Sequence, residues 1–321
     1  AGHFCEFYAR DFGWIVQSLM KLGQEDRVQN TLTYALKKYH KAGKITTTLS
    51  PEGRAFDFPT YAPDSLAFML FSLRTAKAYN LVEKYRTFLN QELQRAYTVC
   101  YDPELGLIKR KTHFSSMKDH AVTDSSCYNN VMLAVMQREA KLLKLENPFK
   151  TNFKNNFKNT IKKHFWTGEY FLDDLSGTTH IAGDANLFPF WTGIFDEKSM
   201  LRKAIVSIKK AHLDSPIPLR YTSKTVKSQE KMIYLEAFAQ AYERDTCWMH
   251  MGPLFIEMVT KVDREQARRY LSKIKKLIER DQNYLELYWE SLKPFSSPFY
   301  YADESMSWCA NYLTLAEELY G

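Results

Sequence analysis

The sequence predicts an all-α protein in which helical hairpins close into a ring. Apolar residues recur at helical spacing along most of the 321-residue chain, and no convincing strand alternation appears. Only 12 glycines are present, which argues against a turn-dense β fold or a glycine loop for nucleotides. Hydrophobic residues make up 45% of the chain and supply a sizeable core, so we expect a single domain over residues 1–321.

The first four helices form two expected hairpins. Phe12, Val16 and Leu19 follow helical spacing in the first helix, which Gly23 ends. Asp64 begins the third helix at a position that suits an N-cap. The four helices are expected at about residues 8–22, at 25–42, from residue 64 onward and at 81–99.

A long loop at about 101–123 precedes a fifth helix, which begins after Asp124 and runs to about Leu145. Loops of this length are uncommon in compact domains and are often functional. The expected sixth helix, about 148–165, places Phe or Ile at every fourth position with lysines between them. We interpret it as an outer helix with one buried face and one solvated basic face. The alternative is a face that binds nucleic acid or a membrane surface.

The second half of the chain continues the hairpin pattern. Its helices are expected at about residues 185–194, 197–212, 248–261, 264–281 and 305–319, while 229–246 fits either a helix or a structured loop. Successive hairpins begin roughly 55–65 residues apart, which is longer than solenoid repeats. A closed ring explains this spacing, with the opening helix of each pair inside and the closing helix outside. One outer helix is then unaccounted for, and we expect it before residue 1.

Composition and motifs exclude several other classes of protein. The net charge of +7 is modest for this length, so we expect no nucleic-acid partner. The five cysteines are odd in number and contain no C-x-x-C pair, which indicates reduced thiols and a cytoplasmic protein. There is neither an apolar stretch of about 18 residues nor a cationic and apolar leader, so we expect no membrane span.

The sequence also offers no recognisable metal or cofactor site. No H-E-x-x-H, P-loop, dinucleotide or G-x-S-x-G motif is present, so we expect no metal and no cofactor. His250 is interpreted as a satisfied interior histidine rather than a ligand. Cys127 follows His120 closely, but we interpret it as a buried inert thiol rather than a nucleophile.

Five motifs occur in order along nearly the whole chain. They are YARDFGWIVQSLMKLG, FSSMKDHAVTDSSCYNNVMLAVMQREAKLL, GDANLFPFWTGIFDE, YERDTCWMHMGPLFIEMV and NYLELYWES with MSWCANYLTLAEEL. In this order they resemble segments of the (α/α)6-barrel glycoside hydrolases, nearest to the glucoamylase and amylo-α-1,6-glucosidase (glycogen-debranching) groups. The resemblance implies an (α/α)6 toroid that cleaves a terminal α-linked glucose from an oligosaccharide or polysaccharide, mostly with inversion.

The resemblance also implies a pair of catalytic carboxyls. Such hydrolysis needs one carboxyl to protonate the leaving oxygen and another to activate water. Asp119 stands at the position of the family's acid; alternatively it is a surface carboxylate paired with Lys118. Asp124 is a second candidate acid, whose alternative role is an N-cap. Glu286 stands on the base position, with a solvated carboxylate at a helix end as the alternative and Glu290 as the fallback.

Further residues are candidates for holding the substrate. Arg10 and Asp11 resemble the pair that binds the outer hydroxyls of the terminal sugar, although an ion pair within the helix is the alternative. For the aromatic candidates the alternative is ordinary core packing. The remaining candidate substrate-binding residues are Trp14, Tyr61, Asp64, Lys118, Asp184, Trp248, Tyr288 and Trp308.

The chain departs from the family at the acid motif. Where those enzymes have Trp-Glu or Trp-Met-Asp, this sequence reads Met117-Lys118-Asp119. Two alternatives therefore stay open: a catalytically silent carbohydrate-binding barrel, and another enzyme on the same barrel such as an invertase, a trehalase or a uronate lyase. A ring of hairpins places the loops at about 43–62, 101–123, 166–184 and 282–304 on one mouth, where the carboxyls must meet.

Overall fold

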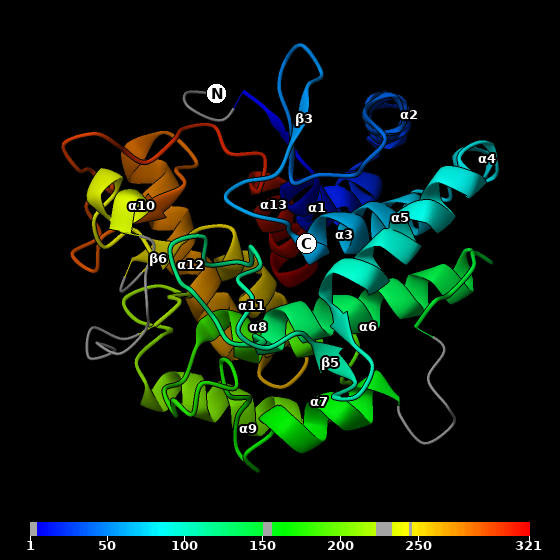
Figure 1. The fold of residues 1–321 in the computed structure, drawn as a ribbon. Coiled ribbons are helices and arrows are strands. Elements are labelled where there is room, and N and C mark those ends of the chain that lie inside the picture. Colours follow the sequence, from blue (N-terminus) through cyan, green and yellow to red (C-terminus); the bar gives the residue numbers. More distant parts are fainter. Residues whose placement is uncertain (1–4, 150–155, 223–232, 244–245) are drawn as a thin grey trace. The chain divides into compact units, whose positions relative to one another are not determined.

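The computed structural model describes residues 5–149, 156–222, 233–243 and 246–321. The chain divides into two compact units. The N-terminal unit comprises Phe4–Ser116 and Asn129–Lys163, and the C-terminal unit comprises Met117–Tyr128 and His164–Gly321. The colours of Figure 1 follow the chain through both units.

The N-terminal unit is built on two helices that pack against each other. α1 (Ala9–Lys21) contacts α3 (Pro63–Thr75), and α2 (Glu25–Ala42) packs on α1 (Figure 1). α3 is buried on all sides from Pro63 to Leu73, as expected for an interior helix, whereas α2 buries only one stripe. The hairpin pairing predicted for this part, with inner opening helices and outer closing helices, is therefore confirmed within the unit.

Two predicted helix boundaries in this unit are wrong. The helix expected at 81–99 is two helices, α4 (Tyr79–Lys84) and α5 (Arg86–Cys100), which are separated at Tyr85. Asp64 is not an N-cap, because Pro63 occupies the first helical position and Ala62 precedes it. Proline suits that position because the missing N–H would have no partner there in any case.

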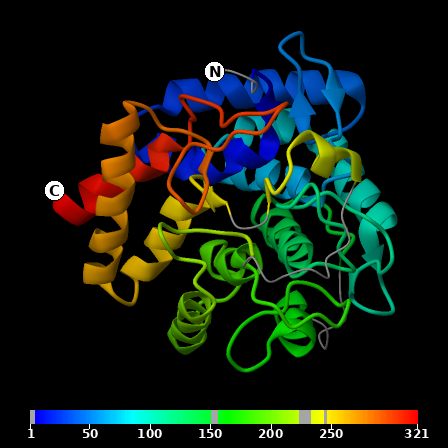
Figure 2. The ribbon, with the colours of Figure 1, turned by 90° about the vertical axis from the view of Figure 1, so that its left-hand side faces the viewer.

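The C-terminal unit repeats the same arrangement. α11 (Met251–Thr260) contacts α8 (Gly183–Trp191) on one side and α13 (Cys309–Tyr320) on another. α9 (Lys198–Lys210) packs on α8, and α12 (Arg264–Asp281) packs on α11. α12 and α13 also lie side by side, as the orange and red helices of Figure 2 show. The opening helices α8 and α11 are buried almost throughout, and the closing helices keep exposed charged faces.

Two helices span the boundary between the units. α6 (Cys127–Leu142) begins three residues after Asp124, later than predicted. α7 (Phe157–Phe165) is shorter than the helix expected at 148–165, since residues 148–149 form a turn; residues 150–155 lie outside the described residues. Its Phe157, Ile161 and Phe165 are fully buried while Lys162 and Lys163 are exposed, which confirms the outer-helix interpretation for this stretch.

The loops are joined by short strands, and the sequence did not predict these strands. β1 (Phe7–Tyr8), β2 (Thr48–Leu49) and β3 (Ala55–Phe56) form an antiparallel sheet in which Phe7 pairs with Leu49 and Leu49 with Ala55. Two further pairs are β4 (Tyr101–Asp102) with β5 (Leu107–Ile108), and β6 (Cys247–Trp248) with β7 (Leu287–Tyr288). Two-residue strands leave no alternation in the sequence, so only tertiary contact reveals them.

The segment at 229–246 is partly helical. It contains α10 (Ile233–Phe238), and the part of the prediction that falls on 229–232 and 244–245 lies outside the described residues. Among the described residues, no helix combines the length and apolar composition needed to cross a bilayer.

Candidate active site

Glu286 is a buried carboxylate surrounded by hydrogen-bond donors. It lies in the loop between α12 and β7, where its backbone N–H donates to the Asp303 carbonyl at 2.9 Å. Its carboxylate accepts hydrogen bonds from the hydroxyls of Tyr242 and Tyr300, the latter at 2.8 Å, and from the Asp303 N–H at 3.1 Å. Only 1% of Glu286 is exposed, so the alternative of a solvated carboxylate is wrong.

The surroundings of Glu286 bring its pKa close to neutral pH. Burial raises the pKa of Glu286 to about 7, while the hydrogen bonds from Tyr242, the Asp303 amide and Tyr300 limit that rise. A carboxyl that titrates near neutral pH can gain and lose a proton readily, which is what a general acid or base requires.

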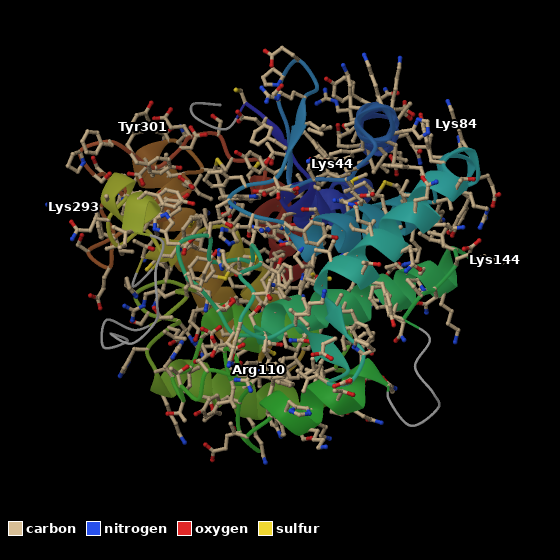
Figure 3. The ribbon with its side chains drawn as sticks, in the orientation of Figure 1. Lys44, Lys84, Arg110, Lys144, Lys293 and Tyr301 are labelled. Atoms are coloured by element: carbon tan, nitrogen blue, oxygen red, sulfur yellow. The ribbon has the colours of Figure 1, made fainter. Side chains whose placement is uncertain are left out.

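Tyr300 reaches Glu286 from a small hairpin turn in the last loop. Ser297 donates its backbone N–H to the Tyr300 carbonyl and its hydroxyl accepts from the Tyr300 N–H at 3.0 Å. Elsewhere in the same loop, Lys293 and Tyr301 point outward (Figure 3), and 53% of Tyr301 is exposed. The turn therefore directs one of its two adjacent tyrosines to the carboxylate and leaves the other largely in solvent.

A buried ion cluster fixes the loop that carries Asp119. The Lys118 ammonium lies 2.5 and 2.6 Å from the two carboxylate oxygens of Asp173 and 3.6 Å from Asp184, and His180 contacts Asp173 at 3.0 Å. Lys118, Asp173 and Asp184 are almost fully buried. The ammonium of Lys118, a predicted substrate-binding residue, is therefore enclosed by the carboxylates of Asp173 and Asp184.

The two aspartates of the ion cluster have pKa values shifted in opposite directions. Burial alone would raise the pKa of Asp173, but the Lys118 ammonium and His180 lower it well below its usual range. Asp184 lies farther from the ammonium, in the first turn of α8, and burial raises its pKa to about 6. Asp173 is thus the permanent counter-ion of Lys118, while Asp184 takes up a proton in mildly acidic conditions.

Glu243 is a further candidate site residue, which the sequence did not reveal. Its two carboxylate oxygens accept hydrogen bonds from the consecutive backbone N–H groups of Asp119 and His120, the second at 2.8 Å. Burial, followed by the nearby charge of Asp119, raises its pKa well above the usual value. Its position beside Tyr242 in YERD was the available signal, but it falls in the segment that fitted either a helix or a loop.

Aromatic rings join these groups into one cluster within the C-terminal unit. The Tyr242 ring stacks on His120 at 5.5 Å and contacts the edge of Trp248 at 4.7 Å. His250 lies 4.9 Å from both Trp248 and Trp308, which are 5% and 3% exposed. Both tryptophans were predicted to contact substrate, and the structure surrounds them with other rings. Trp248 lies in β6 rather than at the start of the next helix, since α11 begins at Met251.

The interpretations of the histidine and cysteine near this cluster agree with the structure. The Nε2 of His250 lies 3.2 Å from the Tyr221 hydroxyl, which donates at 2.8 Å to the Met117 carbonyl. Cys127 is fully buried, and burial raises the pKa of its thiol well above the usual value. A thiol in this state is a poor nucleophile, as predicted.

Arg10 and Asp11, the predicted sugar-binding pair, lie in the N-terminal unit. Arg10 donates from Nε to the Asp64 carboxylate at 2.5 Å and from Nη2 to the Ser115 hydroxyl at 3.4 Å. Arg10 and Asp64 are 6% and 0% exposed, and Asp11 is half-buried. The structure thus joins α1 to α3 through Arg10 and Asp64, two predicted substrate-binding residues that are 54 positions apart in sequence.

Two aromatic candidates accompany this pair in the N-terminal unit. Trp14 is 4% exposed and meets the edge of Phe68 at 6.4 Å, in the contact between α1 and α3. Tyr61 lies under the Arg95 guanidinium at 5.1 Å, and its backbone carbonyl accepts from the Ser115 N–H. The loops predicted at 43–62 and 101–123 therefore meet at Tyr61 and Ser115.

Three other candidate site residues make contacts outside the cluster around Glu286. The backbone of Asp124 bonds to Asp174 and Leu175, and this residue lies too far before α6 to cap it. Glu290, the fallback base, has a side chain that is 42% exposed and lies 3.4 Å from Arg220. The Tyr288 hydroxyl donates to Asp281 at 2.8 Å.

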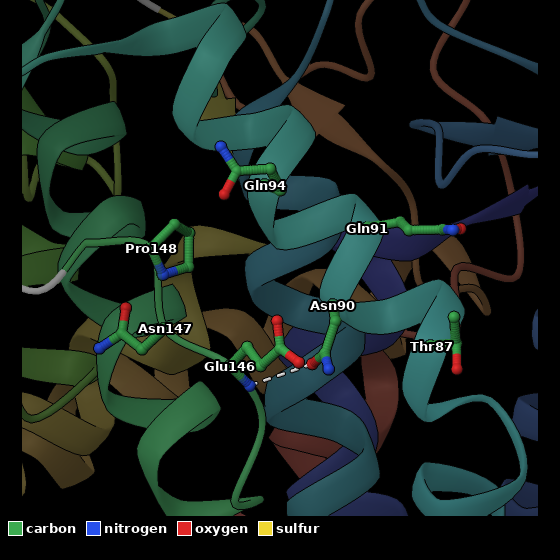
Figure 4. Close-up of a pocket in the computed structure, with 7 residues that line it drawn as sticks. All are labelled: Thr87, Asn90, Gln91, Gln94, Glu146, Asn147 and Pro148. Atoms are coloured by element: carbon green, nitrogen blue, oxygen red, sulfur yellow. Dashed lines mark hydrogen bonds between the residues drawn. The ribbon is translucent and has the colours of Figure 1, made fainter.

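A separate groove of about 600 Å³ lies in the N-terminal unit between α5 and the segment that follows α6 (Figure 4). Its lining is mostly uncharged and polar, with Glu146 as the one carboxylate. A single carboxylate does not supply the pair that glycoside hydrolysis needs. The lining residues are Thr87, Asn90, Gln91, Gln94, Glu146, Asn147 and Pro148. Within the described residues, no cluster of three or more His, Cys, Asp or Glu side chains is arranged to hold a metal ion.

Solved structures of glycosidases match almost the whole chain. A wild-type glycosidase matches with a TM-score of 0.61 and 14% identity, covering 98% of this chain and 88% of that one. A GH63 mannosylglycerate hydrolase from Thermus thermophilus, in complex with glucose, matches with a TM-score of 0.61 and 12% identity, covering 99% and 94%. The Hormoconis resinae glucoamylase matches with a TM-score of 0.60 and 11% identity, covering 98% and 66%. No family model and no curated protein matches the sequence.

These likenesses establish the class of fold. The chain has the (α/α)6 toroid fold of these glycosidases, and the predicted fold class and resemblance are confirmed at this level. At 10–14% identity the likeness extends to the fold alone, so the activity has to be argued from the site.

Proposed function

We propose that this protein is an inverting glycoside hydrolase that removes a terminal α-linked glucose from an oligosaccharide or polysaccharide. The observation that carries the proposal is the environment of Glu286, a buried carboxylate that accepts from two tyrosine hydroxyls and titrates at a pKa of about 7. The same unit holds Asp119 on a loop that is fixed by Lys118 and Glu243. The GH63 mannosylglycerate hydrolase that shares the fold, and whose structure is in complex with glucose, supports this class of substrate.

In the proposed reaction Asp119 is the general acid and Glu286 the general base. Asp119 donates its proton to the glycosidic oxygen as the bond between that oxygen and the anomeric carbon breaks. A water attacks the anomeric carbon from the opposite face and gives its proton to Glu286. The hydroxyls of Tyr242 and Tyr300 orient the Glu286 carboxylate toward that water. Proton exchange with solvent then restores both carboxyls.

Product release from α-1,4 and α-1,6 gluco-oligosaccharides, trehalose and sucrose tests the proposal. Glu286→Gln removes the base with little change in shape, and Glu290→Gln is the matched control because that carboxylate is 42% exposed. We expect glucose release that falls about 10³-fold in Glu286→Gln and stays near wild type in Glu290→Gln. Unchanged release in Glu286→Gln would contradict the assignment of the base.

A carbohydrate-binding barrel without catalysis is the second candidate. The observation that favours it is Lys118, which stands inside the family's acid motif and is held in the buried ion cluster. This candidate predicts saturable binding of the same sugars by calorimetry, with no glucose released by the wild type.

A further inference from the structure

The backbone of Asp119 is held on both sides of its Cα atom by one side chain. Glu243 accepts hydrogen bonds from the N–H of Asp119 and from the N–H of His120, the second at 2.8 Å. The first N–H belongs to the peptide plane before the Asp119 Cα, and the second belongs to the plane after it. Because peptide units are planar, only the rotations φ and ψ at Asp119 relate these two planes. A side chain that binds both N–H groups therefore restricts both rotations, and with them the direction of the Asp119 side chain.

The two neighbours of Asp119 in the sequence are anchored as well. The Lys118 ammonium, on one side, lies in the buried ion cluster. The His120 ring, on the other side, stacks on Tyr242 at 5.5 Å. Within residues 114–121, Asp119 is the one residue that is half-buried, and the others are buried. The stretch is thus fixed before and after the one side chain in it that remains partly accessible.

We infer that Glu243 is a positioning residue that aims Asp119, the proposed general acid, at the glycosidic oxygen by fixing its backbone. The inference rests on the proposed function, in which Asp119 donates its proton to that oxygen. Glu243 supplies no proton in this role and acts through the two N–H groups alone. One N–H donates to Oε1 and the other to Oε2, so the role uses both oxygens of the carboxyl group.

The residue before Glu243 contacts the proposed base. The Tyr242 hydroxyl donates to the Glu286 carboxylate, so one dipeptide binds both the loop of the acid and the side chain of the base. A catalytic group that is misplaced by about 1 Å can cost roughly 10²-fold in rate. Because Glu243 binds the acid loop, its loss should impair protonation of the leaving group more than attack by water.

A comparison of two substrates that differ in their leaving group tests the inference. An α-linked disaccharide of glucose needs its leaving oxygen protonated, whereas α-glucosyl fluoride releases fluoride, a stable anion that needs little help from an acid. In the second reaction the C–F bond breaks as water bonds to the anomeric carbon, and the proton of that water passes to Glu286. Glu243→Gln replaces one acceptor oxygen by an NH2 group. We expect kcat/KM to fall about 10²-fold for the disaccharide and less than about threefold for the fluoride.

Three further variants calibrate the comparison. Asp119→Asn removes the proposed acid and should show the same selective loss, and Glu286→Gln should lose both activities. Glu318→Gln, a change of an exposed glutamate on α13 in the same unit, should lose neither. If Glu243→Gln does not fold, Glu243→Asp, whose side chain is one methylene shorter, takes its place in the same comparison.

The outcomes separate the inference from the proposed function. A selective loss in both Asp119→Asn and the Glu243 variant supports the inference. Equal losses on the two substrates in a folded Glu243 variant, or no loss on either, overturn it, while a selective Asp119→Asn leaves the proposed function in place. If Asp119→Asn is not selective, or if the wild type releases glucose from neither substrate, the proposed function fails and the inference fails with it.

Discussion

Glu286 shows how burial and hydrogen bonding together set one carboxyl's chemistry. Burial favours the neutral acid, while two tyrosine hydroxyls and the Asp303 amide favour the carboxylate, and the balance leaves a pKa of about 7. A base must be ionised, so we expect kcat/KM to fall about tenfold per pH unit below about pH 7. A pH profile of glucose release measures this limb, and a plateau that continues to about pH 5 would contradict it.

The Tyr300 hydroxyl affects the pKa of Glu286, and therefore the pH at which the acidic limb of the profile falls. Its hydrogen bond stabilises the ionised form of Glu286 and so lowers the pKa of this carboxyl. We expect Tyr300→Phe to move the acidic limb about half to one pH unit higher, because one charge-stabilising hydrogen bond is lost. Tyr301→Phe is the matched control, since this neighbouring ring is 53% exposed. Equal profiles for the two variants would show that the Tyr300 hydroxyl has no part in setting the pKa.

The sequence indicated some of these residues and could not indicate others. Asp119 and Glu286 could be named as candidates because they occupy positions in motifs that resemble a known family. Tyr242 and Glu243 were not, because their hydrogen bonds to Glu286 and to the Asp119 amide cross 44 and 124 residues. Lys118 looked like a ligand-facing charge until its three-dimensional neighbours, Asp173 and Asp184, were known.

At the scale of elements, one glycine sets the distance between α1 and α3. A Cβ on Gly13 would lie 2.5 Å from the side chain of Phe68, which no real contact tolerates. We expect Gly13→Ala to lower the free energy of unfolding by about 1–3 kcal/mol, because the helices must separate. Urea denaturation measures it, with Gln17→Ala as the control because that residue is exposed on the same helix. A loss no larger than that of the control would mean that Phe68 adapts without cost.

The buried ion pair of Lys118 with Asp173 stabilises the loop that carries Asp119. Lys118→Met would leave Asp173 buried without its cation, so we expect a loss of about 3–5 kcal/mol in the free energy of unfolding. Lys293→Met, on an exposed loop, should cost little (Figure 3). The two variants are compared by urea denaturation at neutral pH. A loss that equals the control's would indicate that water or His180 replaces the ammonium.

Helices were easier to predict than their ends. The all-round burial of α3, α8 and α11 appears in the sequence as long apolar runs, which is why the inner helices were recognised. The break at Tyr85 and the two-residue strand pairs depend on packing between distant segments and leave no periodic signal. The hairpin order was therefore predictable, and the connections that carry the carboxyls were not.

At the scale of the whole molecule, the candidate residues divide by unit. The N-terminal unit holds the buried Arg10–Asp64 ion pair. The C-terminal unit holds the carboxyls Asp119, Glu243 and Glu286. Each unit is stabilised by its own pairs of inner and outer helices, so the loops between those helices are free to carry chemistry.

The stereochemistry of the product tests how the whole molecule arranges its two carboxyls. Inversion requires about 6.5–9.5 Å between acid and base, so that a water fits opposite the leaving group, whereas retention requires about 5–5.5 Å. The Tyr242 hydroxyl donates to Glu286, and the adjacent Glu243 accepts from the Asp119 amide. The proposed reaction needs a water between Glu286 and the anomeric carbon, so we expect the wider separation and therefore β-glucose as the first product of an α-linked substrate. Proton NMR during the first minutes of hydrolysis distinguishes the anomers before mutarotation mixes them. Initial α-glucose would mean that a carboxylate attacks the sugar directly, and Glu286 would then be the nucleophile rather than the base.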